Sequence, residues 1–189
     1  MTPFETAWAR TLPVEGDFSN GLKDRGGATR YGVTEAVARE NGYTGRMEDY
    51  PASEASRVAK LRYWDSLRLD SVAGVSLPVA LELFDTGYNA GPGTAGKFLQ
   101  RSLNALNREG NDYADVAVDG VIGGGTVAAL LAFVRLRGQA GELVLLRALN
   151  GLQCAHYIGI AEKDRTQETF VFGWISSRVE ITAKSVFTV

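Results

Sequence analysis

Apolar residues recur at helical spacing along most of the chain. Near the N-terminus Phe4, Trp8 and Leu12 are four residues apart, so they share one face of a helix. The residues Thr2 to Glu5 form a capping box with proline at the first helical position, which is a helix-start signal. Because Pro13 lacks a backbone N–H and clashes with the preceding turn, we expect this helix to end or bend near residue 12.

The same periodicity predicts seven further helices. The clearest one opens at Ser76, with Leu77, Leu81, Phe84 and Tyr88 at spacings of four, three and four. The segment 141–163 is apolar nearly all round at Leu143 to Leu146, which indicates a buried central helix. The remaining five are expected at about residues 34–41, 53–64, 94–109, 126–137 and 168–185.

The segment from Val14 to Thr34 breaks this pattern. It holds five glycines in twenty-one residues and has neither a helical nor a strand period. We expect a structured loop or a short β-hairpin here, and strands nowhere else. No internal repeat or low-complexity linker interrupts the chain. The sequence therefore predicts a mainly α protein packed as one globule.

Composition and charge exclude several classes of protein. The 189 residues are 45% hydrophobic and 22% charged, as is typical of folded proteins. The 20 basic residues nearly balance 22 acidic ones and form no basic stripe, which argues against nucleic-acid binding. The single cysteine, Cys154, rules out an intrachain disulfide. With the single histidine, His156, it makes a zinc site of the Cys/His type untenable, and we expect neither residue to do chemistry.

The chain shows no membrane or export signal by composition. No apolar run approaches the roughly 20 residues of a membrane span. The N-terminus lacks the basic start and apolar run of a signal peptide. We therefore expect a soluble protein that is made in a reducing compartment.

Two carboxylates in the glycine-rich segment suggest chemistry. Glu15 lies between Val14 and Phe18, and such apolar neighbours raise the pKa of a carboxyl group, as a general acid requires. Asp24 follows nine residues later, and two carboxylates in different environments are the minimum for glycoside hydrolysis. The alternative is that Glu15 is a surface charge and Asp24 a turn residue, and spacing alone favours that alternative.

A set of ordered motifs changes this balance. Glu-Gly-x-aromatic at Glu15, followed by Asp-x-Gly-Gly-x-Thr-x-Tyr-Gly-Val-Thr from Asp24, resembles the N-terminal signature of the family 108 glycoside hydrolases. These are peptidoglycan-cleaving N-acetylmuramidases of phage endolysins and bacterial cell-wall enzymes. The resemblance extends over about residues 4–180. Its further motifs are Tyr63-Trp64-Asp65, Phe84-Asp85, Asn89-Ala90-Gly91, Asp119 to Gly123, Thr126, and Phe172-Gly173-Trp174 with Arg178.

The resemblance implies a lysozyme-like helical fold and hydrolysis of the β-1,4 bond between N-acetylmuramic acid and N-acetylglucosamine. It places the catalytic general acid at Glu15, and a further likeness to phage lysozymes makes Asp24 and Thr29 its supporting pair. It implies no metal and no cofactor. Residues 1–90 would form the catalytic half and 95–180 a peptidoglycan-binding half. The expected substrate-binding residues are Tyr31, Tyr88, Asn89 and Gln100.

The resemblance leaves some points open. Asp17 and Phe18 stand where the family has glycine and tyrosine, and we expect Asp17 to face solvent. The glycines after Asp119 suit a tight turn, with Thr126 capping the next helix. The aromatic cluster Phe170, Phe172 and Trp174 fits either glycan contact or core packing.

Two other functions remain as alternatives, a lytic transglycosylase and a non-catalytic wall-binding module. A transglycosylase has little use for a water-activating Asp24, and the presence of Glu15 weighs against a module that has lost activity. The expected partner is the peptidoglycan glycan strand. We expect a monomer that reaches the wall through a separate holin or export system.

Overall fold

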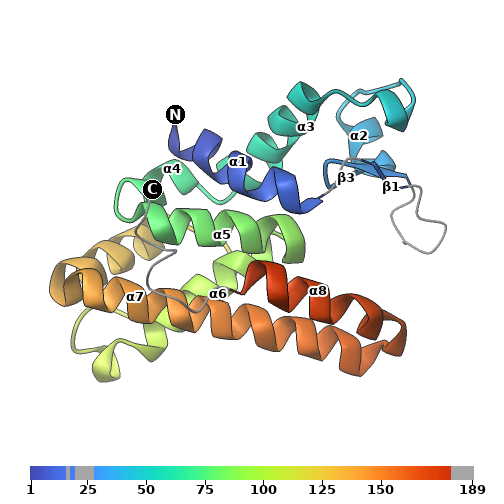
Figure 1. The fold of residues 1–189 in the computed structure, drawn as a ribbon. Coiled ribbons are helices and arrows are strands. Elements are labelled where there is room, and N and C mark those ends of the chain that lie inside the picture. The colour runs from blue at the N-terminus through green and yellow to red at the C-terminus, as the bar shows by residue number, and fades with distance from the viewer. Residues whose placement is uncertain (16–17, 20–27, 180–189) are drawn as a thin grey trace. The chain divides into compact units, whose positions relative to one another are not determined.

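The computed structural model describes residues 1–15, 18–19 and 28–179, and the side chains of all these except 12–15 and 18–19 (Figure 1). The described residues are mainly helical, as predicted, and all their strands lie between residues 18 and 34. The helices are α1 (Pro3–Glu15), α2 (Glu35–Glu40), α3 (Ala52–Ala59), α4 (Leu69–Ala73), α5 (Leu77–Ala90), α6 (Pro92–Ala105), α7 (Gly124–Lys163) and α8 (Glu168–Arg178). The strands are β1 (Phe18–Ser19), β2 (Thr29–Arg30) and β3 (Val33–Thr34).

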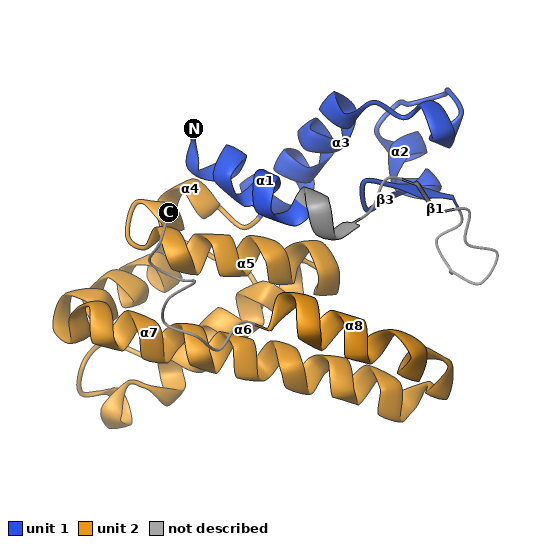
Figure 2. Ribbon diagram, viewed as in Figure 1, with its two compact units in different colours: residues 1–66 blue, residues 67–189 orange. Residues whose placement is uncertain are grey.

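The chain forms two compact units, residues 1–66 and residues 67–189 (Figure 2). Unit 1 holds α1 to α3 and the sheet, and unit 2 holds α4 to α8. Short 3-10 turns at Met47–Asp49, Arg108–Gly110 and Arg165–Gln167 connect helices, and a π-helical stretch, Lys60–Asp65, extends α3.

The capping box at the start of α1 forms as predicted. The Thr2 backbone N–H donates to the Glu5 carboxylate at 2.7 Å, and the Glu5 N–H donates to the Thr2 hydroxyl at 3.2 Å. The helix continues through Pro13 to Glu15, so of the two outcomes expected near residue 12, an end or a bend, the end does not occur. The aromatic side of α1 packs within unit 1, where the rings of Phe4 and Trp64 meet edge to face at 5.7 Å.

The three strands form an antiparallel sheet in the order β1-β2-β3. Ser19 pairs with Thr29, and Thr29 pairs with Thr34. Tyr31 and Gly32 form the two-residue turn between β2 and β3, with φ of 51° and 72°. Positive φ at both central residues is the requirement of a type I′ turn, whose twist matches that of the flanking strands. The glycine-rich segment thus ends in a defined hairpin.

Unit 2 is built around α5, α6 and α7. All three contribute side chains with no or almost no exposed surface, including Leu83, Phe84, Leu99, Leu103, Leu130, Leu145 and Leu149. The two helices expected at 126–137 and 141–163 both form within α7, on either side of a kink at Gly138, where the backbone is non-helical and φ is 59°. We expected Thr126 to cap this helix. The prediction is wrong, because α7 begins at Gly124 and Gly123 is its N-cap.

Two glycines bring α6 into contact with the Asp119–Gly123 turn. A Cβ atom on Gly96 would lie 2.1 Å from the backbone oxygen of Gly120. Gly120 has a φ of 87°, and a Cβ on it would lie 2.6 Å from the Gly93 carbonyl oxygen. The turn and the helix therefore approach as closely as backbones allow, which supports the structural role expected of these glycines.

This contact predicts a matched pair of stability effects. We expect Gly96→Ala to lower the free energy of unfolding by roughly 1–3 kcal/mol, because the new methyl group must push the turn away. Gly93→Ala on the same helix is the control, since a Cβ there meets no atom within 4 Å. Urea unfolding of both variants measures the difference. Equal stabilities would show that the turn yields without strain.

Candidate functional site

Glu15 is the last residue of α1, and only its backbone is described. Asp24 and Asp17 lie outside the described residues. β1 starts three residues after Glu15, and its Ser19 pairs with Thr29. Asp24 falls in the sequence between β1 and β2. The described backbone therefore brings Glu15 and Thr29 to the part of unit 1 where α1 passes into the sheet.

The hairpin that carries Thr29 and Tyr31 is tied to the rest of unit 1. The Arg30 guanidinium donates to the backbone oxygen of Glu48 and lies 5.0 Å from the Tyr31 ring centroid. Tyr31 also packs, half-buried, against a core cluster that includes Val33, Met47 and Tyr50. Thr34 then caps α2 by accepting from the Val37 N–H at 3.4 Å. These contacts give Thr29 and Tyr31 a fixed support, as a site that must hold a sugar requires.

The other three expected substrate-binding residues belong to unit 2. Tyr88 is half-buried on α5, with its ring tilted against that of Phe84 at 5.9 Å. Asn89 is exposed one residue later, and its amide donates to the backbone oxygen of Asp85 at 2.9 Å. Both positions are compatible with sugar contact, so both stay proposals.

Gln100 has a different role. Its side chain is only 1% exposed, and both ends of its amide are used. Its nitrogen donates to the Asp119 carboxylate at 2.8 Å and to the Val121 carbonyl at 3.1 Å, while its oxygen accepts from the Gly120 N–H at 2.8 Å. The Val121 N–H and then Gln100 lower the pKa of Asp119. Gln100 therefore has no surface for a glycan, and we correct its assignment to holding the turn.

A partly buried ion pair between α5 and α8 was not predicted from the sequence. One Asp85 oxygen accepts from the Arg178 guanidinium at 2.9 Å, and the other accepts from the Gln153 amide at 3.0 Å. The Gln153 amide nitrogen also lies 3.2 Å from the Tyr157 hydroxyl. Burial, and next the Asp85 carboxylate, raise the pKa of Tyr157, which stays neutral. The network joins α5, α7 and α8. Asp85 and Arg178 both belong to the motifs that carry the resemblance. They are 93 residues apart, so no local pattern predicts that they pair.

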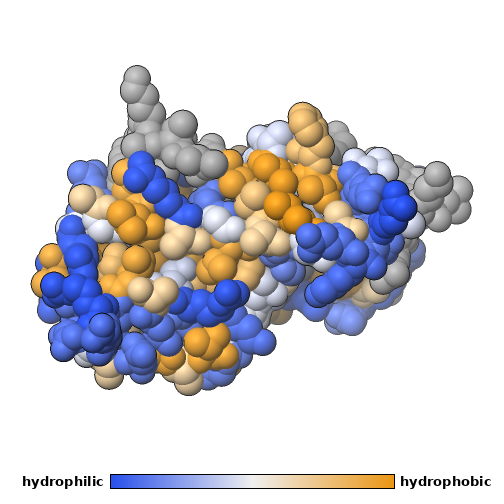
Figure 3. Space-filling view, turned by 90° about the horizontal axis from the view of Figure 1, so that it is seen from below, coloured by the Kyte–Doolittle hydropathy of each residue, from blue (hydrophilic) through white to orange (hydrophobic). Residues whose placement is uncertain are grey.

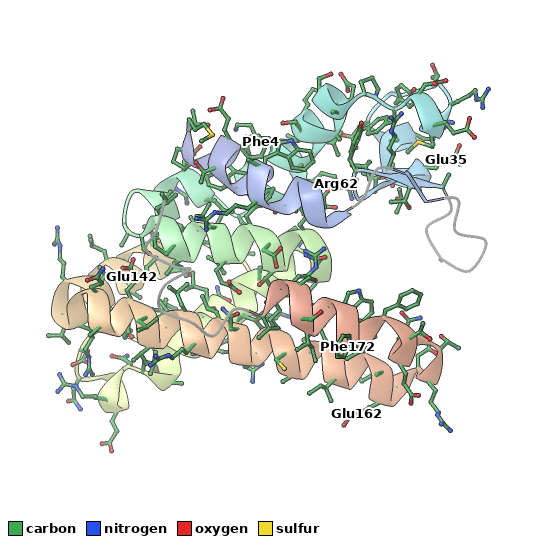
Figure 4. All side chains as sticks on the ribbon, viewed as in Figure 1. Phe4, Glu35, Arg62, Glu142, Glu162 and Phe172 are labelled. Carbon is green, nitrogen blue, oxygen red and sulfur yellow. The ribbon has the colours of Figure 1, made fainter. Side chains whose placement is uncertain are left out.

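The aromatic residues of α8 divide between core and surface. The Trp174 ring packs on Tyr157 at 5.4 Å and stacks with Phe170 at 6.0 Å, and Trp174 is itself half-buried. Phe172 is 84% exposed and is marked on α8 in Figure 4. Apolar residues also interrupt the hydrophilic surface on the face drawn in Figure 3. Packing and exposure thus coexist on one helix, so neither of the two roles expected for the cluster accounts for all of it.

The remaining candidates offer no other chemistry. Within the described ranges, no three histidine, cysteine, aspartate or glutamate side chains gather closely enough to hold a metal ion. Burial, and then Lys163, lower the pKa of His156. In the part of the chain that the structure covers, no helix combines the length and apolarity needed to cross a bilayer.

Two family models match consecutive parts of the chain. Residues 8–91 match the family described as Glycosyl hydrolase 108, and residues 94–179 match the family described as Predicted Peptidoglycan domain. No curated protein sequence matches the chain. The boundary between the two families falls at Gly91, between α5 and α6, whereas the boundary between the compact units follows Ser66.

A solved structure matches almost the whole chain. Brucella abortus SagA aligns with a TM-score of 0.71 at 25% sequence identity, over 97% of this chain and 94% of that one. The mainly helical, lysozyme-like fold class is thereby confirmed. Residues 8–91 thus form a glycosyl hydrolase 108 domain, a peptidoglycan domain follows at residues 94–179, and with these two domains the chain is a peptidoglycan hydrolase.

Proposed function

We propose that the enzyme is a lysozyme-type N-acetylmuramidase, which hydrolyses the β-1,4 bond between N-acetylmuramic acid and N-acetylglucosamine. The observation that carries this proposal is the family match from residue 8, which includes Glu15 at the end of α1 and the hairpin that follows. In this proposal Glu15 is the general acid that protonates the leaving-group oxygen.

The other site residues take supporting roles in this proposal. Asp24 activates or orients the attacking water, and Thr29 on β2 helps to hold that water in place. Tyr31, Tyr88 and Asn89 contact the sugar rings and their acetamido groups. Residues 1–90 form the catalytic half, and 95–180 hold the wall. The protein acts as a monomer, and a separate holin or export system gives it access to the wall.

The products of digestion test the reaction type. Hydrolysis of purified peptidoglycan in oxygen-18 water should give reducing-end N-acetylmuramic acid that carries the label. A transglycosylase would instead give unlabelled anhydro ends, because no water enters the bond. Mass spectrometry separates the two products, and anhydro ends from the wild-type enzyme would refute the hydrolytic reaction.

The same assay tests Asp24. We expect Asp24→Asn to slow hydrolysis by about 10²-fold or more, because a neutral amide cannot accept the proton of the water. The label in the remaining product should be unchanged. A fully active Asp24→Asn enzyme would leave hydrolysis standing and remove Asp24 from the mechanism.

A further inference from the structure

A pocket lies between α6 and α7, and none of the residues proposed above for the site lines it. Its volume is about 350 Å³. It opens where small residues of the two helices face each other. Its lining consists of Arg101, Ser102, Ala105 and Leu106 from α6 and its C-cap, and Ala148, Gly151 and Leu152 from α7.

Gly151 keeps this space open. A Cβ atom on Gly151 would meet no other atom within 4 Å, so close packing does not explain the glycine. A glycine inside a helix also destabilises that helix relative to a residue with a side chain. Glycine at position 151 therefore leaves the pocket open and makes α7 less stable than a residue with a side chain would.

The charged residues nearest to the pocket along both helices are basic. Lys97 and Arg101 are the only charged residues of α6. In α7, Arg147 is the only lysine, arginine, aspartate or glutamate between Leu143 and Ala161. All three basic side chains are exposed. Helical spacing of four puts Lys97 and Arg101 in line with Ala105, and Arg147 in line with Gly151. In a chain with a net charge of -2, this local excess is suited to an anionic ligand.

One charged group that lines the pocket is available to a ligand. Arg101 makes no hydrogen bond or ion pair with any other described residue, so its guanidinium can take a carboxylate in a bidentate contact.

We infer that this pocket binds the stem peptide of peptidoglycan, not its sugar backbone. The inference depends on the proposed function at one point only, namely that the polymer bound is peptidoglycan. Stem peptides join alanine residues to residues with free carboxylates, so a methyl group enters the small apolar pocket while a carboxylate meets Arg101. Sugar rings bind best against aromatic faces, and among the residues that the structure describes no aromatic one lines this pocket.

Direct binding to the full-length protein tests the inference. The probe is a sugar-free stem peptide, L-alanyl-γ-D-glutamyl-L-lysyl-D-alanine, and the comparison ligand is N,N′-diacetylchitobiose. Nitrogen-15 amide spectra should show shifts at residues 101–106 and 148–152 with the peptide and none there with the disaccharide. Shifts at these residues with the disaccharide alone would make the pocket a glycan site and overturn the inference.

Three variants sharpen the test. Gly151→Leu fills the pocket, and Arg101→Ala removes the cation. Each should weaken peptide binding roughly tenfold or more, which for Arg101→Ala is the usual effect of losing a charged hydrogen bond. Gly159→Leu is the matched control on α7, because a Cβ there also meets no atom within 4 Å and Gly159 does not line the pocket. Its peptide affinity should equal that of wild type.

The outcomes separate this inference from the proposed reaction. If Gly151→Leu and Arg101→Ala bind the peptide as tightly as wild type, the pocket is not its site. If Gly151→Leu does not fold, as circular dichroism will show, the surface substitution Arg101→Ala decides alone. Peptide binding is measured without cleavage, so its absence leaves the muramidase proposal intact, and a failure of that proposal leaves peptide binding intact.

Discussion

Replacing Glu15 with glutamine is expected to slow peptidoglycan cleavage by about 10²–10⁴-fold, the usual contribution of a general acid. The amide keeps the size of the side chain but has no proton of suitable acidity to give to the leaving oxygen. Clearing of permeabilised cells and release of reducing ends measure the rate. The melting temperature should remain that of wild type, because the substitution changes neither the helix nor the sheet.

A glutamate elsewhere in unit 1 provides the control. Glu40 forms an exposed ion pair with Arg62 at 2.6 Å, and such pairs contribute little to stability. Glu40→Gln should therefore cleave as fast as wild type. If Glu15→Gln also keeps nearly full activity, the general acid is another residue, and Asp17 is the next carboxylate to replace.

The second large effect concerns the part of the chain that can fold alone. A fragment of residues 94–179, the extent of the peptidoglycan-domain match, is expected to be largely unfolded. It lacks α5, whose buried side chains include Val79, Leu81, Leu83 and Phe84. Each such side chain contributes roughly 1.5–3 kcal/mol, so their loss removes about 6–12 kcal/mol. That is comparable to the whole stability of a domain, about 5–15 kcal/mol.

A longer fragment is the control for this prediction. Residues 67–179 retain α4 and α5 and should show a cooperative thermal transition by circular dichroism and dispersed amide spectra. The fragment 94–179 should show neither. A cooperative transition in the shorter fragment would mean that α6, α7 and α8 form a sufficient core without α5. The result decides whether the family boundary or the unit boundary marks the folding unit.

Most helices were predictable because their apolar period is long enough to recognise. α5 and α6 begin within two residues of the expected positions. α4 was missed because Leu69–Ala73 is too short to show a period. The break at Gly138 was also predictable, since the backbone there is non-helical and separates the two helical stretches expected at 126–137 and 141–163. The hairpin was expected, whereas its register depends on the Tyr31-Gly32 turn.

The site was less predictable than the fold, because its contacts are distant in sequence. Gln100 has the polar chemistry of a sugar ligand, and only the structure shows that it hydrogen-bonds a turn about twenty residues away. Gly151 has no sequence feature that separates it from Gly159, and its role emerges from the open space beside it. Local patterns identify residue types, but burial decides which of them remain available to a ligand.

The Asp85–Arg178 ion pair sets an order for folding during synthesis. Arg178 follows its partner by 93 residues, so the ribosome must make nearly all of unit 2 before the pair can close. Until then, Asp85 has no cation from α8, and Tyr157 lacks the ring of Trp174. Unit 1, complete at residue 66, can fold earlier, as N-terminal domains generally do. The packing of α8 is therefore a late step in folding, because it depends on contacts between residues that are distant in the sequence.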